Sequence, residues 1–368
     1  MGAQLAASTA VPADRRLVSH DDGAIWPPGW IAHATAVRDV LVQLKRLGTL
    51  AVVDADGRAV GTLADADVRR ALLRGITLDD PVSRLMSALP ADAASARRTN
   101  ADPSRPDTAH MAERLVVVMA GGLGRRLRPL TDRRPKPLVD IGGRPLVELT
   151  IESLREQGFR RFVFCVGYRA HMIRRRFGDG RRLGVQIDYL KDPTRLGTAG
   201  PLGLLAQVPQ TPLLVINGDV LTDVDFRQLM QFHDDAGAAA TVCVTQMAVT
   251  VPYGVVSLDG DRVAAIEEKP MRRCFVNAGI YVLEPYALQA LPPRRLVDMP
   301  ELLQTLTRRG DRVAAFPLYE SWMDVGSPAD VVCATEAWGG RARIDAAGQS
   351  AKTPTGDGRP AELVFDDL

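Results

Sequence analysis

A glycine-rich turn with basic residues behind it is the part of the chain best suited to bind an anion. The turn follows a short apolar run at residues 115–119, and its small residues are Ala120, Gly121, Gly122 and Gly124. Because glycine has no Cβ, the backbone N–H groups of such a turn can approach a phosphate closely. Arg126 and Lys136 add positive charge a few residues further on. The segment therefore predicts a triphosphate site.

Two aspartates stand where carboxylates could hold a divalent cation. Asp219 follows a glycine at the end of the apolar run 213–216, and Asp324 lies in the sequence Trp-Met-Asp-Val-Gly. If the two converge on one site, they suit Mg²⁺, which prefers hard oxygen ligands shared with phosphate. An aspartate between a strand and a turn can instead form an Asx turn or cap a helix. The sequence leaves both roles open.

Alternating strands and helices must position these residues. Strands are predicted at 115–119, 162–166, 185–190, 213–216 and 239–244, and helices at 170–177 and 226–233. This alternation predicts an α/β fold with three layers around a mainly parallel sheet. Ligands of such sheets bind at the carboxyl ends of the strands, so the glycine turn and Asp219 should share that edge. The later strands 255–258, 263–267 and 275–283 predict an antiparallel extension that forms the second wall of a cleft.

Five segments are expected along the chain. Residues 1–20 should be mobile, 21–90 should form a small α/β unit, and 91–113, which are polar and without periodicity, should be a linker. Residues 114–339 should form the large α/β domain. The tail 340–368 is polar and glycine-rich, and we expect it to be disordered.

Composition excludes several classes of protein. The 368 residues carry a net charge of +2, which gives no electrostatic case for binding nucleic acid or membrane. Since the sequence has no apolar run of transmembrane length and no basic segment followed by an apolar core at residues 1–16, we expect neither a transmembrane helix nor a secretory signal. The cysteines have no zinc-ligand spacing, and we expect buried free thiols in a reducing cytoplasm at Cys165, Cys243, Cys274 and Cys333.

Seven short motifs follow one another in an order that is typical of one enzyme family. They lie at residues 120–139, 196–200, 217–219, 253–255, 267–270, 276–280 and 322–326. Together they resemble the sugar-1-phosphate nucleotidyltransferases, also called NDP-sugar pyrophosphorylases. One glycine-rich motif alone would be weak evidence, but seven in order are specific. The resemblance implies a Rossmann-like sheet of the glycosyltransferase-A type.

The resemblance also implies roles for individual residues. Arg126 would stabilise the departing pyrophosphate, Lys136 would contact the α-phosphate, and Mg²⁺ would be held by Asp219 and Asp324. The implied nucleotide-binding residues are Ala120, Gly121, Gly122, Gly124, Asp192, Gly197, Thr198 and Ala199. Asp192 stands where relatives often carry a glutamate, which is one methylene longer. The implied sugar-phosphate-binding residues are Gly254, Glu268, Lys269, Asn277 and Gly279.

The chemistry of nucleotidyl transfer agrees with the residues present. Attack on the α-phosphate of an NTP requires positioning and charge neutralisation rather than covalent help. The nucleophile, an oxygen of the sugar phosphate, is already ionised at neutral pH. No general base is needed, so the lack of a Ser/His/Asp or Cys/His arrangement is no objection.

The resemblance favours GTP and a sugar 1-phosphate as substrates, giving a GDP-sugar and pyrophosphate. Thymidylyl, uridylyl or cytidylyl transfer within the same family is the first alternative. A non-catalytic subunit that senses an NDP-sugar is the second alternative. The retention of Arg126, Lys136, Asp219 and Asp324 argues against it, because a binding protein need not keep leaving-group and metal residues.

Residues 30–89 resemble a CBS module, and such modules are fused ahead of the transferase in one branch of the family. The resemblance is carried by residues 51–54, 61–73 and 85–86. Ala64 stands where a hydroxyl residue is usual, three positions before the Asp67 that would meet a ribose. CBS modules normally occur in pairs, and too few residues follow for a second copy. The unit is therefore expected either to pack against its counterpart in a homodimer or to sense a nucleotide.

Overall fold

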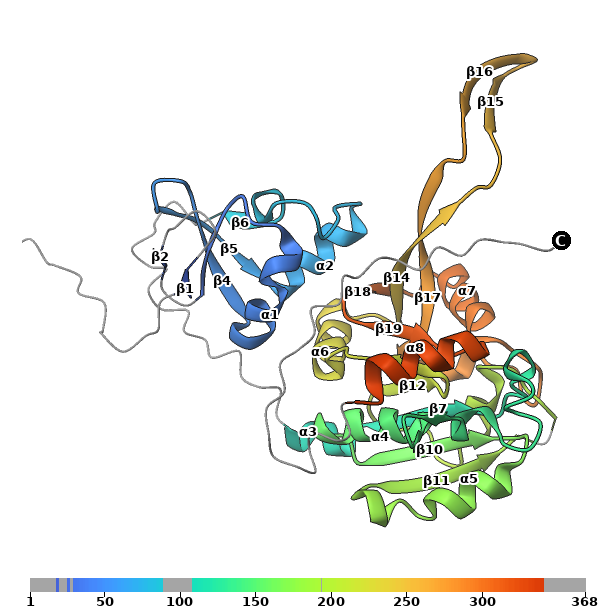
Figure 1. The fold of residues 1–368 in the computed structure, drawn as a ribbon. Helices are drawn as coiled ribbons and strands as arrows, with labels where there is room; N and C mark the ends of the chain where they lie inside the picture. Colours follow the sequence, from blue (N-terminus) through green and yellow to red (C-terminus); the bar gives the residue numbers. More distant parts are fainter. Residues whose placement is uncertain (1–17, 20–24, 27–28, 89–107, 193, 341–368) are drawn as a thin grey trace, which may run out of the picture. The chain divides into compact units, whose positions relative to one another are not determined.

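The protein consists of two compact units in the computed structural model (Figure 1). The structure describes residues 18–19, 25–26, 29–88, 108–192 and 194–340. The units are Met1–Ser104 and Arg105–Leu368. The expected mobile N-terminus and tail lie almost wholly outside the described residues. Helix α3 (Thr108–Glu113) begins within the stretch expected to be a linker, and its Met111 is buried.

The N-terminal unit contains a four-stranded sheet in the order β3-β4-β5-β6 and two helices that contact each other. Its elements are β1 (Val18–Ser19), β2 (Ile25–Trp26), β3 (Trp30–Ala32), α1 (Val37–Leu47), β4 (Thr49–Val53), β5 (Ala59–Ala64), α2 (Asp65–Leu73) and β6 (Ser87–Ala88). Asp67 accepts hydrogen bonds from Ala64 N at 2.8 Å and from the Ser87 hydroxyl at 3.1 Å. Both of its carboxylate oxygens are therefore engaged within the unit, where the resemblance had placed a ribose contact.

The larger unit alternates strands and helices as the sequence predicts. Its helices are α3, α4 (Leu146–Glu156), α5 (Ala170–Phe177), α6 (Phe226–Ala236), α7 (Met299–Arg308) and α8 (Pro328–Trp338). Its strands are β7 (Leu115–Ala120), β8 (Asp140–Ile141), β9 (Arg144–Pro145), β10 (Arg161–Val166), β11 (Gln186–Lys191), β12 (Leu213–Asn217), β13 (Val220–Thr222), β14 (Ala240–Thr250), β15 (Val255–Asp259), β16 (Arg262–Glu267), β17 (Met271–Leu283), β18 (Val313–Leu318) and β19 (Trp322–Asp324). Short 3₁₀ turns include η4 (Lys136–Leu138), η6 (Gly200–Leu204) and η7 (Pro285–Ala290).

A seven-stranded sheet in the order β11-β10-β7-β12-β17-β14-β18 forms the centre of this unit. Strands β11, β10, β7 and β12 pair in parallel, as do β14 and β18. Only β17 runs against its neighbours β12 and β14. The predicted α/β class is confirmed, and the carboxyl ends of β7, β12 and β14 lie at one edge.

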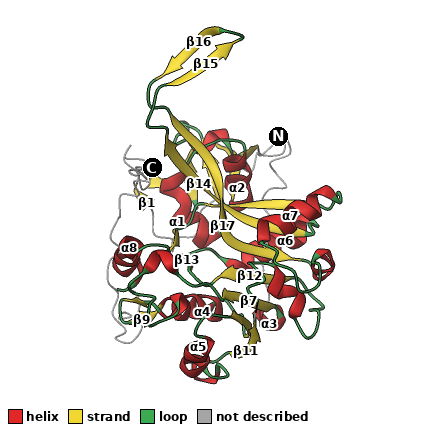
Figure 2. Cartoon of the chain, turned by 90° about the vertical axis from the view of Figure 1, so that its right-hand side faces the viewer, coloured by secondary structure: helices red, strands yellow, loops and turns green. Residues whose placement is uncertain are grey.

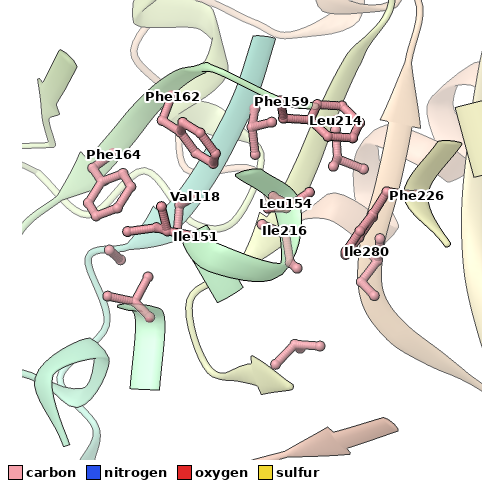
Figure 3. Packing of buried hydrophobic residues seen from close by; sticks show 14 of the residues in the cluster. Val118, Ile151, Leu154, Phe159, Phe162, Phe164, Leu214, Ile216, Phe226 and Ile280 are labelled. Carbon is pink, nitrogen blue, oxygen red and sulfur yellow. The ribbon is translucent and has the colours of Figure 1, made fainter. Parts of the chain in front are cut away.

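Apolar side chains on both faces of the sheet produce the layers. One face packs against α4, α5 and α6, and Figure 3 shows Ile151 and Leu154 of α4 among the aromatic side chains of this core. The other face, with Val117 and Val215, packs against η6, η7 and α7. Alternation along β7 and β12 divides the side chains between the two faces, because successive residues of a strand point to opposite sides.

A two-stranded arm leaves the sheet at the same edge. The paired strands β14 and β17 continue beyond the sheet, and β15 and β16 form a hairpin at the far end (Figures 1 and 2). The antiparallel extension predicted from the sequence is therefore present. In both views it points away from the sheet instead of folding over it as a wall.

Two remaining expectations concern the membrane and the cysteines. None of the helices within the described ranges is both long and apolar enough to cross a bilayer. All four cysteines are free thiols, and Cys165 and Cys243 are buried as expected. The expected burial is wrong for Cys274 and Cys333, which are exposed because one lies on the arm and the other on the outer side of α8.

Candidate functional site

The ends of β7 and β12 bring the glycine turn next to Asp219. Gly218 N donates a hydrogen bond to Met119 O at 2.9 Å. A Cβ on Gly218 would lie 2.9 Å from the same carbonyl oxygen, so only glycine lets the two backbones approach this closely. Since Gly218 directly precedes Asp219, the carboxylate is fixed beside the start of the glycine turn.

A short antiparallel ladder brings Asp324 to Asp219 across more than a hundred residues of sequence. Strands β13 and β19 pair with Val220 opposite Asp324, and Val325 N donates to Asp219 O at 3.0 Å. The indole of Trp322 donates to Ala278 O at 2.8 Å, which ties β19 to the central strand β17. The predicted convergence of the two carboxylates is therefore produced by three-residue strands that the sequence analysis did not identify.

Lys136 bridges these two carboxylates. Its ammonium Nζ lies 2.5 Å from Asp219 Oδ2 and 3.5 Å from Asp324 Oδ1, and its side chain is only 12% exposed. Arg126 lies at the open side of the cluster, with Nη2 3.8 Å from Asp324 Oδ2 and a side chain that is 76% exposed. The four groups form a neutral cluster of two cations and two anions, which we call the charge cluster.

Asp324 is the least satisfied member of the charge cluster. Burial and the neighbouring Asp219 raise its pKa, and the positive charges of Lys136 and Arg126 only partly oppose them. Among the described residues its buried Oδ1 has no hydrogen-bond partner, and Lys136 Nζ is a cation 3.5 Å away. A Cβ on Gly326 would lie 3.2 Å from the Arg126 guanidinium, so this glycine leaves room for the arginine. The site thus holds a buried carboxylate oxygen without a hydrogen-bond donor.

The glycine turn is held in a shape that needs Gly124. This residue has φ of +61°, and a Cβ there would come within 2.9 Å of Thr131 Cγ2 and 3.1 Å of Lys136 Cβ. The Thr131 hydroxyl donates to Gly124 O at 2.7 Å and closes the turn. A Cβ on Gly122 would meet no atom within 4 Å, so the space above it is open to a ligand.

A pocket of about 380 Å³ lies along this edge of the sheet. It is lined by six of the predicted site residues, Gly121, Gly122, Asp192, Gly197, Thr198 and Asp219. Other residues that line it were not predicted as site residues: Met119, Leu123, Cys165, Gly167, Arg195, Pro201, Asn217, Leu296 and Asp298. Burial and Asp192 raise the pKa of the Cys165 thiol to about 12, so this pocket residue stays protonated and unreactive at neutral pH. Ala120 and Ala199 are buried beneath the pocket.

Asp192 shapes the loop beside the pocket. Its Oδ1 accepts from Thr194 N at 3.2 Å and its Oδ2 accepts from Leu196 N at 2.8 Å. Gly197 has φ of +84°, and a Cβ there would lie 2.5 Å from Val297 O. With both oxygens bonded to loop amides, Asp192 serves the pocket by holding this loop.

Asn277 and Gly279 lie at the base of the arm, next to the pocket. Gly279 has φ of +71°, and a Cβ there would lie 2.6 Å from Asn217 Nδ2. Asn277 accepts from Gly279 N at 3.0 Å and donates to the Tyr281 hydroxyl at 2.8 Å. Asn217 lines the pocket with a buried Oδ1 that has no hydrogen-bond partner among the residues that the structure describes.

The structure does not bring Gly254, Glu268 and Lys269 to the charge cluster. All three are exposed and lie near the hairpin at the far end of the arm (Figure 1). The six residue steps from Asn277 back to Met271, at 3.3 Å each, already span about 20 Å. Lys269 also has a positive φ of 46°, which marks the junction between the hairpin and the paired strands β14 and β17.

Known proteins are similar to the larger unit. Residues 115–338 match the sequence profile of a family described as nucleotidyl transferase. Mannose-1-phosphate guanylyltransferase catalytic subunit beta of Danio rerio is 34% identical over 224 residues, covering 58% of this chain and 61% of that protein. Mannose-1-phosphate guanyltransferase of Candida albicans is 36% identical over 228 residues, covering 60% and 63%.

These matches span about three fifths of the relatives' own length. A solved structure shares the fold. It comes from a Bacillus anthracis protein assigned as a glucose-1-phosphate thymidylyltransferase, with a TM-score of 0.50 and 22% identity, covering 61% of this chain and 94% of that one.

Proposed function

The chain belongs to the nucleotidyl transferase family, and from this we propose that it transfers a nucleotidyl group from an NTP to a sugar 1-phosphate. The observation that carries the proposal is the charge cluster of Arg126, Lys136, Asp219 and Asp324 beside an open glycine turn. We favour GTP as the donor, because two similar proteins are named as mannose-1-phosphate guanylyltransferases.

The reaction that suits this site is an in-line displacement. An ionised oxygen of the sugar phosphate forms a bond to the α-phosphorus, and the bond from that phosphorus to the bridging oxygen breaks. Pyrophosphate leaves with the bridging oxygen, and no proton has to be removed from the nucleophile. The protein therefore needs to position and neutralise the reactants. The turn amides and Lys136 would hold the α-phosphate side, while Arg126 would stabilise the leaving group.

The chemistry of the charge cluster fits Mg²⁺ as cofactor. Mg²⁺ commonly binds proteins through one or two carboxylates and takes its other ligands from phosphates and water. Asp219 and Asp324 offer such a pair, and among the described residues the buried Asp324 Oδ1 accepts no hydrogen bond. We propose that these two aspartates hold the ion, which when bound would neutralise charge on the phosphate oxygens. Lys136, which lies between them, would be drawn toward the substrate.

We propose that the sugar phosphate binds at the base of the arm, near Asn277 and Gly279. The motif resemblance adds Gly254, Glu268 and Lys269 to this site, which requires the arm to approach the cleft. One face of the hairpin supports such a movement. Val256 and Ile266 are paired on it and are 48% and 66% exposed, so no segment within the described ranges covers this apolar face.

We propose that the N-terminal unit is a scaffold that joins copies of the chain. Its helices α1 and α2 expose the apolar side chains Val42, Leu47 and Leu73, and its Asp67 is already bonded within the unit. Sedimentation should show a homo-oligomer for the full chain. A measured particle mass equal to the mass of one chain would refute this role.

The decisive experiment is a matrix of NTPs against sugar 1-phosphates, scored by release of pyrophosphate. Turnover should require both substrates and a divalent cation, and it should be highest with GTP and a mannose-type 1-phosphate. Release of pyrophosphate with an NTP other than GTP would support the proposed reaction but would identify a different nucleotide donor. No release with any pair, together with tight binding of an NDP-sugar, would refute the proposal and support a sensor.

A further inference from the structure

One carboxylate in the pocket has no role in the proposed reaction. Asp298 lines the pocket together with Gly197 and Thr198, and it is the N-cap residue of α7. An N-cap aspartate usually accepts a hydrogen bond from an amide in the first turn of its own helix. The Asp298 side chain makes no such bond. Its direction is therefore set by the loop beside the pocket.

Asp298 is fixed by one of its two oxygens only. Oδ1 accepts from Thr198 N at 2.9 Å and from the Thr198 hydroxyl at 3.2 Å. The same hydroxyl accepts from Met299 N at 2.8 Å, so it is held in turn by α7. Within the part of the chain that the structure describes, Oδ2 has no hydrogen-bond partner. The result is a rigidly placed carboxylate with one acceptor oxygen free.

Neither of the other acidic residues of the pocket offers the same group. Both oxygens of Asp192 accept from loop amides. Asp219 is paired with Lys136 in the charge cluster, at the phosphate end. Asp298 is held instead by the loop at Gly197 and Thr198, two residues that the motif resemblance assigns to the nucleotide. The free acceptor therefore belongs to a different element from the charge cluster, and the base of the nucleotide is the part that it could contact.

A hydrogen-bond donor stands in the same pocket. Arg195 lines it, is exposed, and has no ion-pair or hydrogen-bond partner among the described residues. Its backbone has φ of +58°, a left-handed conformation that residues with a Cβ rarely adopt. Such outliers persist where the surroundings impose them, and they cluster at ligand sites.

An acceptor and a donor of these kinds match one base better than the others. Guanine presents O6 and N7 as acceptors, which suit an arginine, and its N1–H and N2–H groups are donors that suit a carboxylate. Adenine has an amino donor where guanine has O6, so it would meet Arg195 donor to donor. We infer that Asp298, with Arg195, selects guanine: Oδ2 accepts from the N1/N2 edge and the guanidinium donates to O6. This rests on the proposed function, whose donor nucleotide it specifies.

The test is equilibrium binding of GTP and ITP to the full-length protein with Mg²⁺ and without sugar phosphate. ITP differs from GTP only by the missing N2 amino group. The protein should bind GTP about 10- to 100-fold more tightly, the range expected when a charged acceptor loses its donor. In Asp298→Asn the oxygen facing Thr198 can be retained while the free oxygen becomes a donor. GTP should then bind about 10- to 100-fold more weakly, and the GTP/ITP ratio should approach unity.

Two further variants keep the result interpretable. Glu301→Gln changes an exposed carboxylate in the first turn of the same helix and should leave both affinities unchanged. Arg195→Met leaves the contact between Asp298 and Thr198 in place and should reduce the preference for GTP over ATP. This variant tests the inference independently if Asp298→Asn lowers the melting temperature. An unchanged GTP/ITP ratio in a folded Asp298→Asn protein overturns the inference, as does tight binding of UTP or dTTP without GTP. Absence of turnover in the substrate matrix, with GTP binding intact, would instead refute the proposed reaction.

Discussion

Replacing Asp219 by asparagine should remove most of the activity while preserving the fold. The substitution keeps the size of the side chain but turns the neutral charge cluster into one with a net positive charge. It also removes one of the two carboxylates that we propose as Mg²⁺ ligands. Lys136, whose ammonium lies 2.5 Å from Asp219 Oδ2, would retain only the longer ion pair with Asp324 at 3.5 Å. Both the cation and the lysine would therefore be less well placed.

The expected size of the effect follows from the position of Asp219. Loss of one preorganised electrostatic contact in an active site typically costs about 10²- to 10³-fold in rate, or about 2.7–4 kcal/mol. Asp219 is 25% exposed, so screening by water keeps the cost well below that of a charge in a dry interior. We therefore expect kcat/KM to fall about 10²- to 10³-fold. The Mg²⁺ concentration for half-maximal rate should rise as well.

Pyrophosphate release, measured over a range of sugar phosphate concentrations and then over a titration of Mg²⁺, checks both effects. The matched control is Asp188→Asn, the same change at an exposed position of β11. Its kinetics should equal those of the unchanged protein, and both variants should keep the melting temperature. A kcat/KM within about threefold, with no change in the Mg²⁺ response, would remove Asp219 from the metal site and refute the reasoning.

Three further outcomes are expected. Asp225 is the N-cap of α6 and accepts a hydrogen bond from Arg227 N at 2.9 Å. Asp225→Ala should therefore lower the free energy of unfolding, measured by urea denaturation, by about 1–2 kcal/mol. A loss below about 0.5 kcal/mol would contradict the capping role. Burial lowers the pKa of His233, so its contribution to stability is complete above the unfolded pKa of about 6.5 and is lost as the pH falls through the lower native value. The melting temperature should fall as the pH drops below about 6.5, and His233→Gln should flatten this dependence; an equal slope in both proteins would exclude His233 as its source. Glu268→Gln should raise the KM for the sugar phosphate about tenfold with the KM for NTP unchanged, and no change would exclude Glu268 from the sugar site.

The parallel strands are the part of the site that sequence reasoning handles well. The runs before the glycine turn and before Asp219 are short, apolar and bounded by glycine, so they predict buried parallel strands whose carboxyl ends meet. The structure places β7 and β12 side by side with the contact between Gly218 and Met119 at their ends. Local pattern and a general rule of sheet topology are sufficient here.

Long-range pairing limits the prediction of the other carboxylates. The ladder of β13 and β19 has three residues in each strand, which is too short to show a period, and its partners are about a hundred residues apart. Asp324 could therefore be joined to Asp219 only through a resemblance. Asp298 was missed for a different reason. It precedes α7 as the N-cap residue, but its side chain accepts from Thr198 N in a loop a hundred residues earlier.

The arm shows where strand prediction and spatial placement separate. Alternation predicts β15, β16 and β17, but no local signal fixes the direction in which a hairpin leaves a sheet. The hairpin gathers Val256 and Ile266 on one face, with Leu258 and Val263 next to them, all still about half exposed or more. Covering a side chain of this size completely is worth about 1.5–3 kcal/mol, and two strands alone are at best marginally stable in water. Burial of this face against a filled cleft would therefore favour the movement of the arm that we propose, which would bring Glu268 and Lys269 toward the cleft.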